Sequence, residues 1–343
     1  MNPDDLRKAD AIEIVVGQGA KPGGGGMLLG QKISDRVAEM RNLPKGIDQR
    51  SACRHPDWTG PDDLEIKILE LREITGWKVP IYVKVAGARP YYDTTLAVKA
   101  GADAVVLDGM QGGTAATQDV FIEHVGLPTL ACIRPAVHAL RDLGVYRKVK
   151  LIISGGIRTG ADVAKAMALG ADCVSIGTAA LIALGDNDPV HESEYQKLGT
   201  TAGAYDDWHE GRDPAGILTQ DPELSARLDP EVGGRRLANY LNVMTMEAQA
   251  IAARTYLARF LERTRAQKVV PIGPRFQCWK KTRQQQFVDV TRDTSGQVLL
   301  YKGRLITANY VAGSTQMTPD CDALPPTAVR YDFESWTDML AQY

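Results

Sequence analysis

The sequence predicts an α/β fold, a (βα)8 barrel of the TIM type that lacks about two of its β/α units before Ile12. Short apolar runs alternate with helical patterns, as in a parallel sheet that is covered on both faces. The strongest glycine-rich turns follow the last two runs, where a barrel of this kind binds phosphate. An open dinucleotide-binding sheet carries its glycine turn after the first strand, so we favour the barrel.

Six apolar runs are expected to form strands, namely Ile12–Gly17, Ile81–Val85, Ala104–Leu107, Thr129–Ile133, Lys150–Ile153 and Cys173–Ile176. Apolar residues at helical spacing predict helices between several of these runs, at Asp62–Gly76, Asp93–Ala100 and Ala161–Leu169. The sequence Gly-Ala-Asp follows two of the helices, at Gly101 and Gly170. It marks a helix stop and a short loop into the next strand.

The barrel region is expected to cover residues 1–265. Within it, the polar residues 184–229 predict a long ordered loop. An apolar stripe that includes Leu237, Leu241 and Met244 predicts one amphipathic helix over residues 235–265. Residues 266–343 form a tail without an assigned function, in which Val298–Tyr301 and Leu305–Thr307 predict a small hairpin.

Composition and charge argue against several classes of protein. The 343 residues are 44 % apolar and carry a net charge of −2, and no apolar run is long enough to span a bilayer. We therefore expect a cytoplasmic protein that binds neither nucleic acid nor a membrane. The five cysteines show no Cys-x-x-Cys spacing, which favours buried reduced thiols over a catalytic thiol or a metal site.

The strongest ligand-binding candidates are Gly155, Gly156, Gly177 and Thr178. Each pair follows an apolar strand and leads into a helical pattern. Glycine lets the main chain approach an anion, and the N–H groups at the start of the following helix point at it. We predict a joint phosphate cradle with Arg158 as an additional charge, as found in flavin and phosphosugar barrels.

Gln18 and Lys21 lie in the glycine-rich stretch Gly17–Gly26, where they would contact a polar or anionic ligand. A flexible surface turn with a solvated lysine explains this stretch equally well. Lys84 lies inside an apolar strand, where an unpaired cation is costly, and it would stabilise an anionic ring or oxygen. The alternative for Lys84 is an edge position from which the amine reaches solvent.

Gly112, Gly113 and Thr114 end another strand and would shape a site around a planar ring. An ordinary turn between a strand and a helix explains them almost as well.

Several motifs, in this order, resemble those of the FMN-binding synthase domain of the glutamate synthase large subunit. They are Gln18-Gly-Ala-Lys-Pro-Gly23, Gly112-Gly-Thr114, Gly155–Gly160, Gly177-Thr-Ala-Ala-Leu181, Ala183-Leu-Gly185 and Gly216-Ile-x-Thr-Gln-Asp-Pro222. The resemblance covers residues 12–254. The absence of cluster cysteines makes the chain most similar to the stand-alone synthase subunit of methylamine–glutamate N-methyltransferase.

This resemblance implies a TIM-type barrel with FMN at its C-terminal mouth. Ammonia or methylamine would condense there with a 2-oxo or 2-amino dicarboxylate, such as 2-oxoglutarate or glutamate, and form glutamate or N-methylglutamate. The resemblance also places Gln18 and Lys21 at the 2-oxoglutarate and flavin side of the mouth, and Lys84 beside the flavin ring. The phosphate cradle would hold the FMN phosphate.

The chain departs from the family in ways that shape the prediction. Trp208 and Asp213 stand where the family has its second and third iron–sulfur cysteines, so we predict no cluster. Residue 2 is Asn2 rather than a nucleophilic cysteine, so ammonia would come from glutaminase-type and other partner subunits or from solution. Two alternatives stay open, a non-catalytic or truncated scaffold subunit and another FMN barrel oxidoreductase, which would use a strand-end histidine such as His138.

Overall fold

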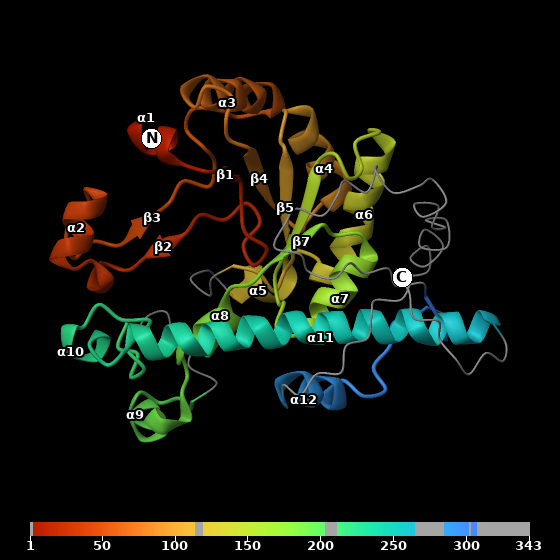
Figure 1. Cartoon of the computed structure of the whole chain (residues 1–343). Coiled ribbons are helices and arrows are strands. Elements are labelled where there is room, and N and C mark those ends of the chain that lie inside the picture. Colours follow the sequence, from red (N-terminus) through yellow and green to blue (C-terminus); the bar gives the residue numbers. More distant parts are fainter. Residues whose placement is uncertain (1–2, 114–118, 203–210, 265–284, 302, 307–343) are drawn as a thin grey trace. The chain divides into compact units, whose positions relative to one another are not determined.

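The computed structural model describes residues 3–113, 119–202, 211–264, 285–301 and 303–306 (Figure 1). The chain divides into two compact units. The first unit is Met1–Arg158 with Gly170–Tyr240, and the second is Thr159–Leu169 with Leu241–Tyr343. All of the predicted site residues belong to the first unit.

The first unit contains a parallel sheet of five strands in the order β1-β4-β5-β6-β7. These strands are β1 (Ile12–Val15), β4 (Ile81–Ala86), β5 (Ala104–Asp108), β6 (Lys150–Ser154) and β7 (Cys173–Ser175). Neighbours in the sheet follow one another in the chain, which is the order of consecutive strands in a (βα)8 barrel. The predicted α/β fold class with a parallel sheet is confirmed. Among the described residues, β1 and β7 each pair on one side only.

One predicted strand is wrong, because Thr129–Ile133 begins helix α6 (Thr129–Asp142). A short apolar run does not distinguish a strand from a buried helix. The buried residues continue at helical spacing beyond the run, through Ala136, Val137 and Leu140. Pro128 precedes the helix at its N-cap, and no strand among the described residues pairs with this segment. The described part of the sheet therefore has one strand fewer than expected.

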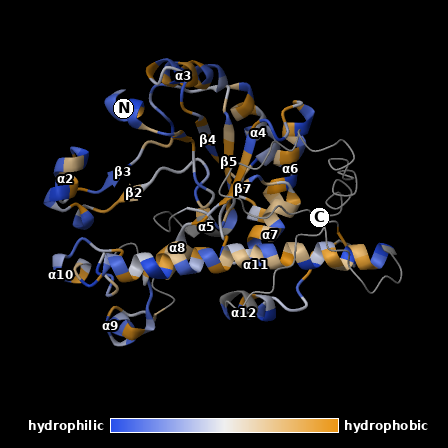
Figure 2. Cartoon of the chain, in the orientation of Figure 1, coloured by the Kyte–Doolittle hydropathy of each residue, from blue (hydrophilic) through white to orange (hydrophobic). Residues whose placement is uncertain are grey.

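Three helices cover one face of the sheet, and the middle strands are mostly apolar (Figure 2). α3 (Pro61–Ile74) contacts β4, α4 (Pro90–Lys99) contacts β4 and β5, and α6 contacts β5 and β6. Alternate strand residues such as Ile81, Val83 and Leu151 are fully buried on that face. Their neighbours point to the other face, where Val15 is 44 % exposed.

The remaining elements of the first unit are short. They are α1 (Pro3–Lys8), β2 (Met27–Leu28), the 3-10 helix η1 (Gly30–Lys32), α2 (Asp35–Arg41), β3 (Gln49–Arg50), α5 (Asp119–His124), α8 (Thr178–Leu184), the 3-10 helix η2 (Pro189–His191), α9 (Glu192–Lys197) and α10 (Pro222–Ser225). β2 and β3 pair antiparallel. The polar stretch 184–229 thus contains short helices joined by turns.

The two Gly-Ala-Asp sequences form the same joint twice. Gly101 and Gly170 adopt positive φ and end their helices, as the sequence predicts. The carboxylate of Asp103 accepts the N–H of Ile81 at 2.8 Å, and that of Asp172 accepts the N–H of Leu151 at 2.9 Å. Each aspartate thus ties the start of its own strand to the neighbouring strand and fixes the register between them.

The second unit contains α7 (Gly160–Leu169), α12 (Gln285–Asp293) and the antiparallel pair β8 (Leu300–Tyr301) and β9 (Arg304–Leu305). The long helix α11 (Pro230–Thr264) contributes its second part to this unit. α11 begins earlier than residue 235, because Asp229 caps the N–H groups of Glu231 and Val232. Among the described residues, no helix has both the length and the apolar composition to cross a membrane.

Candidate functional site

The carboxyl ends of β4, β5, β6 and β7 lie in register, and together they form the carboxyl edge of the sheet. Ala86 pairs with Asp108, Asp108 with Ser154, and Ser154 with Ser175. A glycine turn follows each of these strands, and two such turns bond to the neighbouring strand end. The N–H of Gly87 donates to the Asp108 carbonyl at 2.7 Å, and that of Gly109 donates to the Ser154 carbonyl at 3.0 Å.

Gly155 and Gly156 need to be glycine for steric reasons. Their φ angles are +108° and +72°, which side chains rarely adopt. A Cβ on Gly155 would lie 2.9 Å from the amide nitrogen of Gly112 and 2.7 Å from Thr129 Oγ1. The turn after β6 therefore packs directly on the turn after β5, as close approach of two main chains requires.

Gly177 is the N-cap of α8 and faces open space, since a Cβ placed on it would meet no atom within 4 Å. It follows β7, which pairs with β6, so the two late glycine turns leave the sheet side by side. No hydrogen bond among the described residues uses the main-chain N–H of Gly155, Gly156, Gly177 or Thr178. Unused N–H groups at neighbouring strand ends are the chemistry of an anion site.

The loop after β1 packs against the turn after β5. Gly19 donates its N–H to Asp108 Oδ2 at 3.0 Å, and Ala20 donates to the Gly112 carbonyl at 2.6 Å. A Cβ on Gly19 would lie 1.6 Å from the Gly109 carbonyl oxygen, so only glycine fits there. These bonds bring Gln18 against Gly113, whose φ is +103°. Thr114 lies outside the described residues.

Lys84 and Asp108 form an ion pair at the base of this edge. The Lys84 Nζ lies 3.6 Å from Asp108 Oδ2, and the carboxylate is completely buried. Lys84 is on β4 and Asp108 ends β5, so the sheet register itself brings them together. The lysine is paired rather than directed freely into solvent. Asp108 is absent from the predicted site residues, although a carboxylate that ends an apolar strand just before glycine is a usable signal.

Lys21 is 6 % exposed, and its burial lowers the pKa of its ammonium group. Two side-chain oxygens at this edge of the sheet are buried and have no hydrogen-bond partner among the described residues, Gln18 Oε1 and Asp108 Oδ1. The structure thus brings Gln18, Gly112 and Gly113 together around Asp108 and Lys84. The glycines at 155, 156 and 177 lie at the same edge, towards β7.

The described residues contain no cluster of three His, Cys, Asp or Glu side chains that would hold a metal. Cys132 is buried as predicted, and burial raises the pKa of its thiol to about 11. The expectation of burial is wrong for Cys173, which is exposed on the edge strand β7, and Cys53 is exposed as well. Cys278 and Cys321 lie outside the described residues. Arg134 and His138 lie on α6, where they bond to each other at 3.0 Å.

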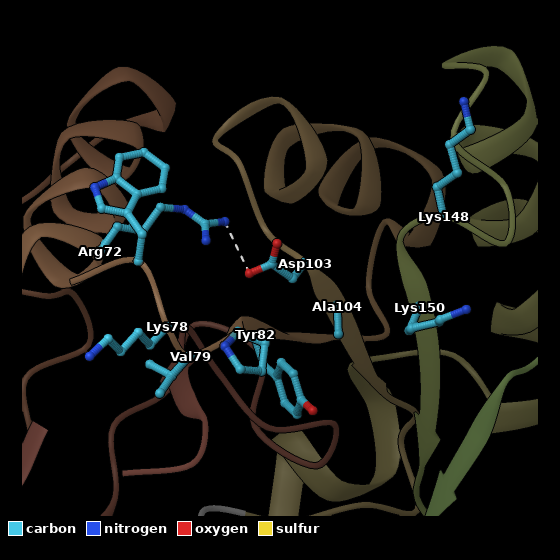
Figure 3. Close-up of a pocket in the computed structure, with 10 residues that line it drawn as sticks. Arg72, Lys78, Val79, Tyr82, Asp103, Ala104, Lys148 and Lys150 are labelled. Carbon is cyan, nitrogen blue, oxygen red and sulfur yellow. Dashed lines mark hydrogen bonds and ion pairs between the residues drawn. The ribbon is translucent and has the colours of Figure 1, made fainter. Parts of the chain in front are cut away.

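A cationic hollow of about 410 Å³ lies at the opposite, amino ends of the strands (Figure 3). Arg72, Lys78, Lys148 and Lys150 line it with a single carboxylate, Asp103. That carboxylate is occupied by the Arg72 guanidinium at 3.0 Å and by the Ile81 N–H. This hollow is separate from the glycine turns. The pair of Arg72 and Asp103 within it belongs to the Gly-Ala-Asp turn that joins β4 and β5.

The fold and this edge together define an α/β protein with glycine turns gathered at the carboxyl ends of parallel strands. The chain belongs to the family defined by the conserved region of glutamate synthase, whose model matches residues 1–189 and 202–257.

Three relatives illustrate this similarity. A glutamate synthase large subunit-like protein of Rhizobium meliloti is 85 % identical over 252 residues, which are 74 % of this chain and 57 % of the relative. An archaeal glutamate synthase (NADPH) of Methanocaldococcus jannaschii is 42 % identical over 73 % of this chain and 46 % of its own length. A ferredoxin-dependent chloroplastic glutamate synthase of Oryza sativa is 33 % identical over 74 % of this chain and 15 % of its own length. The chain spans about half the length of these two relatives, 57 % of the first and 46 % of the second.

Proposed function

We propose that this chain is the FMN-binding part of a synthase of the glutamate synthase type. It would join ammonia or methylamine to a 2-oxo or 2-amino dicarboxylate and form glutamate or N-methylglutamate. The observation that carries this proposal is the set of unused N–H groups at Gly155, Gly156 and Gly177, on the turns after two paired strands. The open space beside Gly177 leaves room for a phosphate group.

The residues present fit a flavin phosphate at β6 and β7 and a planar ring toward β4 and β5. Bound flavin supplies the hydride chemistry, and the chain supplies position and charge. Lys84, held by Asp108, places a cation beside the expected ring position. Lys21, buried in the loop after β1, offers a second cation for the carboxylate of an oxo acid. Glutaminase-type and other subunits would supply ammonia and electrons.

The first test is a titration with FMN, in which the quenching of flavin fluorescence measures binding. Gly177→Asp places a carboxylate in open space at the proposed phosphate position, so the fold should persist while FMN affinity falls by about tenfold or more. Gly234→Asp is the matched control, because a Cβ on Gly234 also meets no atom within 4 Å. Equal FMN affinity in both variants and in the unaltered chain would contradict the proposed phosphate site.

The second test is product formation from ammonia or methylamine with 2-oxoglutarate or glutamate, analysed by mass spectrometry in the presence of reduced FMN. A chain that takes up no FMN, even with its partner subunits, would instead support a scaffold role. That alternative is favoured by one observation, since β1 and β7 each keep one unpaired side in the described part of the sheet. Oxidation of a 2-hydroxy acid by the loaded chain would support the third possibility, another FMN oxidoreductase.

A further inference from the structure

A completely buried carboxylate with an unfilled oxygen lies at the end of β5. Asp108 Oδ2 accepts the N–H of Gly19 at 3.0 Å and pairs with Lys84 at 3.6 Å. Asp108 Oδ1 is equally buried, and no described residue donates to it. A buried carboxylate oxygen without a donor is costly, so native proteins seldom retain one unless something binds there.

A second unfilled acceptor borders the same turn. Gln18 Oε1 is buried without a partner among the described residues. A Cβ on Gly112 would lie 1.8 Å from Asp108 Oδ1, and one on Gly113 would lie 3.3 Å from Gln18 Oε1. Asp108 Oδ1 therefore lies against Gly112 and Gln18 Oε1 lies against Gly113, two consecutive residues that carry no side chain. The hydrogen bond from Ala20 to Gly112 fixes the two loops that carry them.

Two acceptors at one turn select a ligand that donates hydrogen bonds. We infer that Asp108 Oδ1 and Gln18 Oε1 form the subsite for the small amine, ammonia or methylamine, that the synthase would use. This inference rests on the proposed function and adds the position of the nitrogen substrate to it. Methylamine has two N–H groups and one lone pair, so bonds to both oxygens leave the lone pair available for a carbonyl carbon.

The ion pair with Lys84 fits this role. At neutral pH the free amine is mostly the ammonium ion, which must lose one proton before its nitrogen becomes a nucleophile. That proton goes to bulk water before the amine binds, because Asp108 stays a carboxylate that accepts the Gly19 N–H at one oxygen and an N–H of the neutral amine at the other. Lys84 compensates the charge of this carboxylate, which favours a neutral hydrogen-bond donor over a second cation.

The inference is tested on the full chain without flavin, with ¹³C-methylammonium and ammonium chloride as probes and binding followed by NMR. Asp108→Asn should weaken both by about tenfold, because the amide offers a competing donor. Gln18→Met, which keeps the size and removes the acceptor, should weaken them by about three- to tenfold, whereas Gln18→Glu should bind as tightly or more tightly. Glu13→Gln, on an exposed carboxylate of β1, is the control and should change nothing.

Each outcome decides between the claims. Lost amine binding in Asp108→Asn and Gln18→Met, with equal amine binding by Glu13→Gln and the unaltered chain, supports the subsite. Unchanged amine binding in both variants, or no binding by the unaltered chain, overturns it and leaves the flavin proposal standing. Failure of every variant to quench FMN, with amine binding still dependent on Asp108, would overturn the proposed function instead. Preference of the subsite for one probe identifies ammonia or methylamine as its substrate.

Discussion

The Lys21 side chain is buried in the loop after β1, and desolvation of its ammonium group lowers the stability of the folded state. Burial lowers its pKa below the ordinary value of 10.5. Below the folded-state pKa the ammonium is charged in both the folded and the unfolded chain, so the desolvation cost acts in full. Between the folded-state pKa and 10.5, only the unfolded chain keeps the proton, so the contribution of this residue to stability rises with pH.

Lys21→Met should therefore stabilise the fold and impair function. We expect the free energy of unfolding to rise by on the order of 1 kcal/mol near pH 7, and this gain to shrink as the pH approaches the ordinary lysine value. Urea unfolding at several pH values measures the gain, and Lys8→Met, at an exposed position on α1, is the control. A gain that does not depend on pH would show that burial of the charge is not the cause.

Among the elements, the polar stretch after α8 depends on one buried carboxylate. Asp213 is fully buried and accepts the N–H groups of Ala215, Ile217 and Leu218 at 2.9–3.0 Å, as well as the Tyr195 hydroxyl at 3.0 Å. By the resemblance, Asp213 stands at the position of a cluster cysteine. Here hydrogen bonds from the main chain organise the segment around it.

Asp213→Ala should destabilise the first unit by about 3 kcal/mol, because it leaves three N–H groups and a phenol buried without an acceptor. Tyr195→Phe removes only one of these bonds and should cost about 1 kcal/mol. Urea unfolding gives both values, and limited proteolysis should cut Asp213→Ala within residues 186–219 first. If the two variants were equally stable, the carboxylate would not be the organising group.

At the scale of the whole molecule, we expect protection of the backbone amides from hydrogen exchange to decrease from the centre of the sheet toward its two outer strands. Val105 and Leu107 on β5 are fully buried between β4 and β6, whereas β7 has exposed residues at both of its ends. Amide hydrogen exchange followed by mass spectrometry should find the slowest amides in β4 and β5 and faster ones in β1 and β7.

Partner subunits that complete the sheet should slow exchange at both edge strands, and those that bind elsewhere should not. Uniform protection across the five strands of the isolated chain would contradict this gradient.

Local sequence information was sufficient for the alternation of strands and helices, the Gly-Ala-Asp joints and the late glycine turns. These features depend on side-chain periodicity and on main-chain angles within a few residues, so a single stretch of chain encodes them. The same information misassigned Thr129–Ile133, because a short apolar run lacks a period and its helical continuation determines its structure.

The acceptors at the mouth depended instead on contacts between distant stretches. Gln18, Lys84, Asp108 and Gly112 come from different loops and strands, and whether an oxygen is filled depends on every donor that the fold brings within reach. The same holds for the exposure of Cys173, which follows from the place of β7 at the sheet edge. The sequence therefore predicted which glycine turns follow the strands, and packing determined which polar atoms beside those turns have no partner among the described residues.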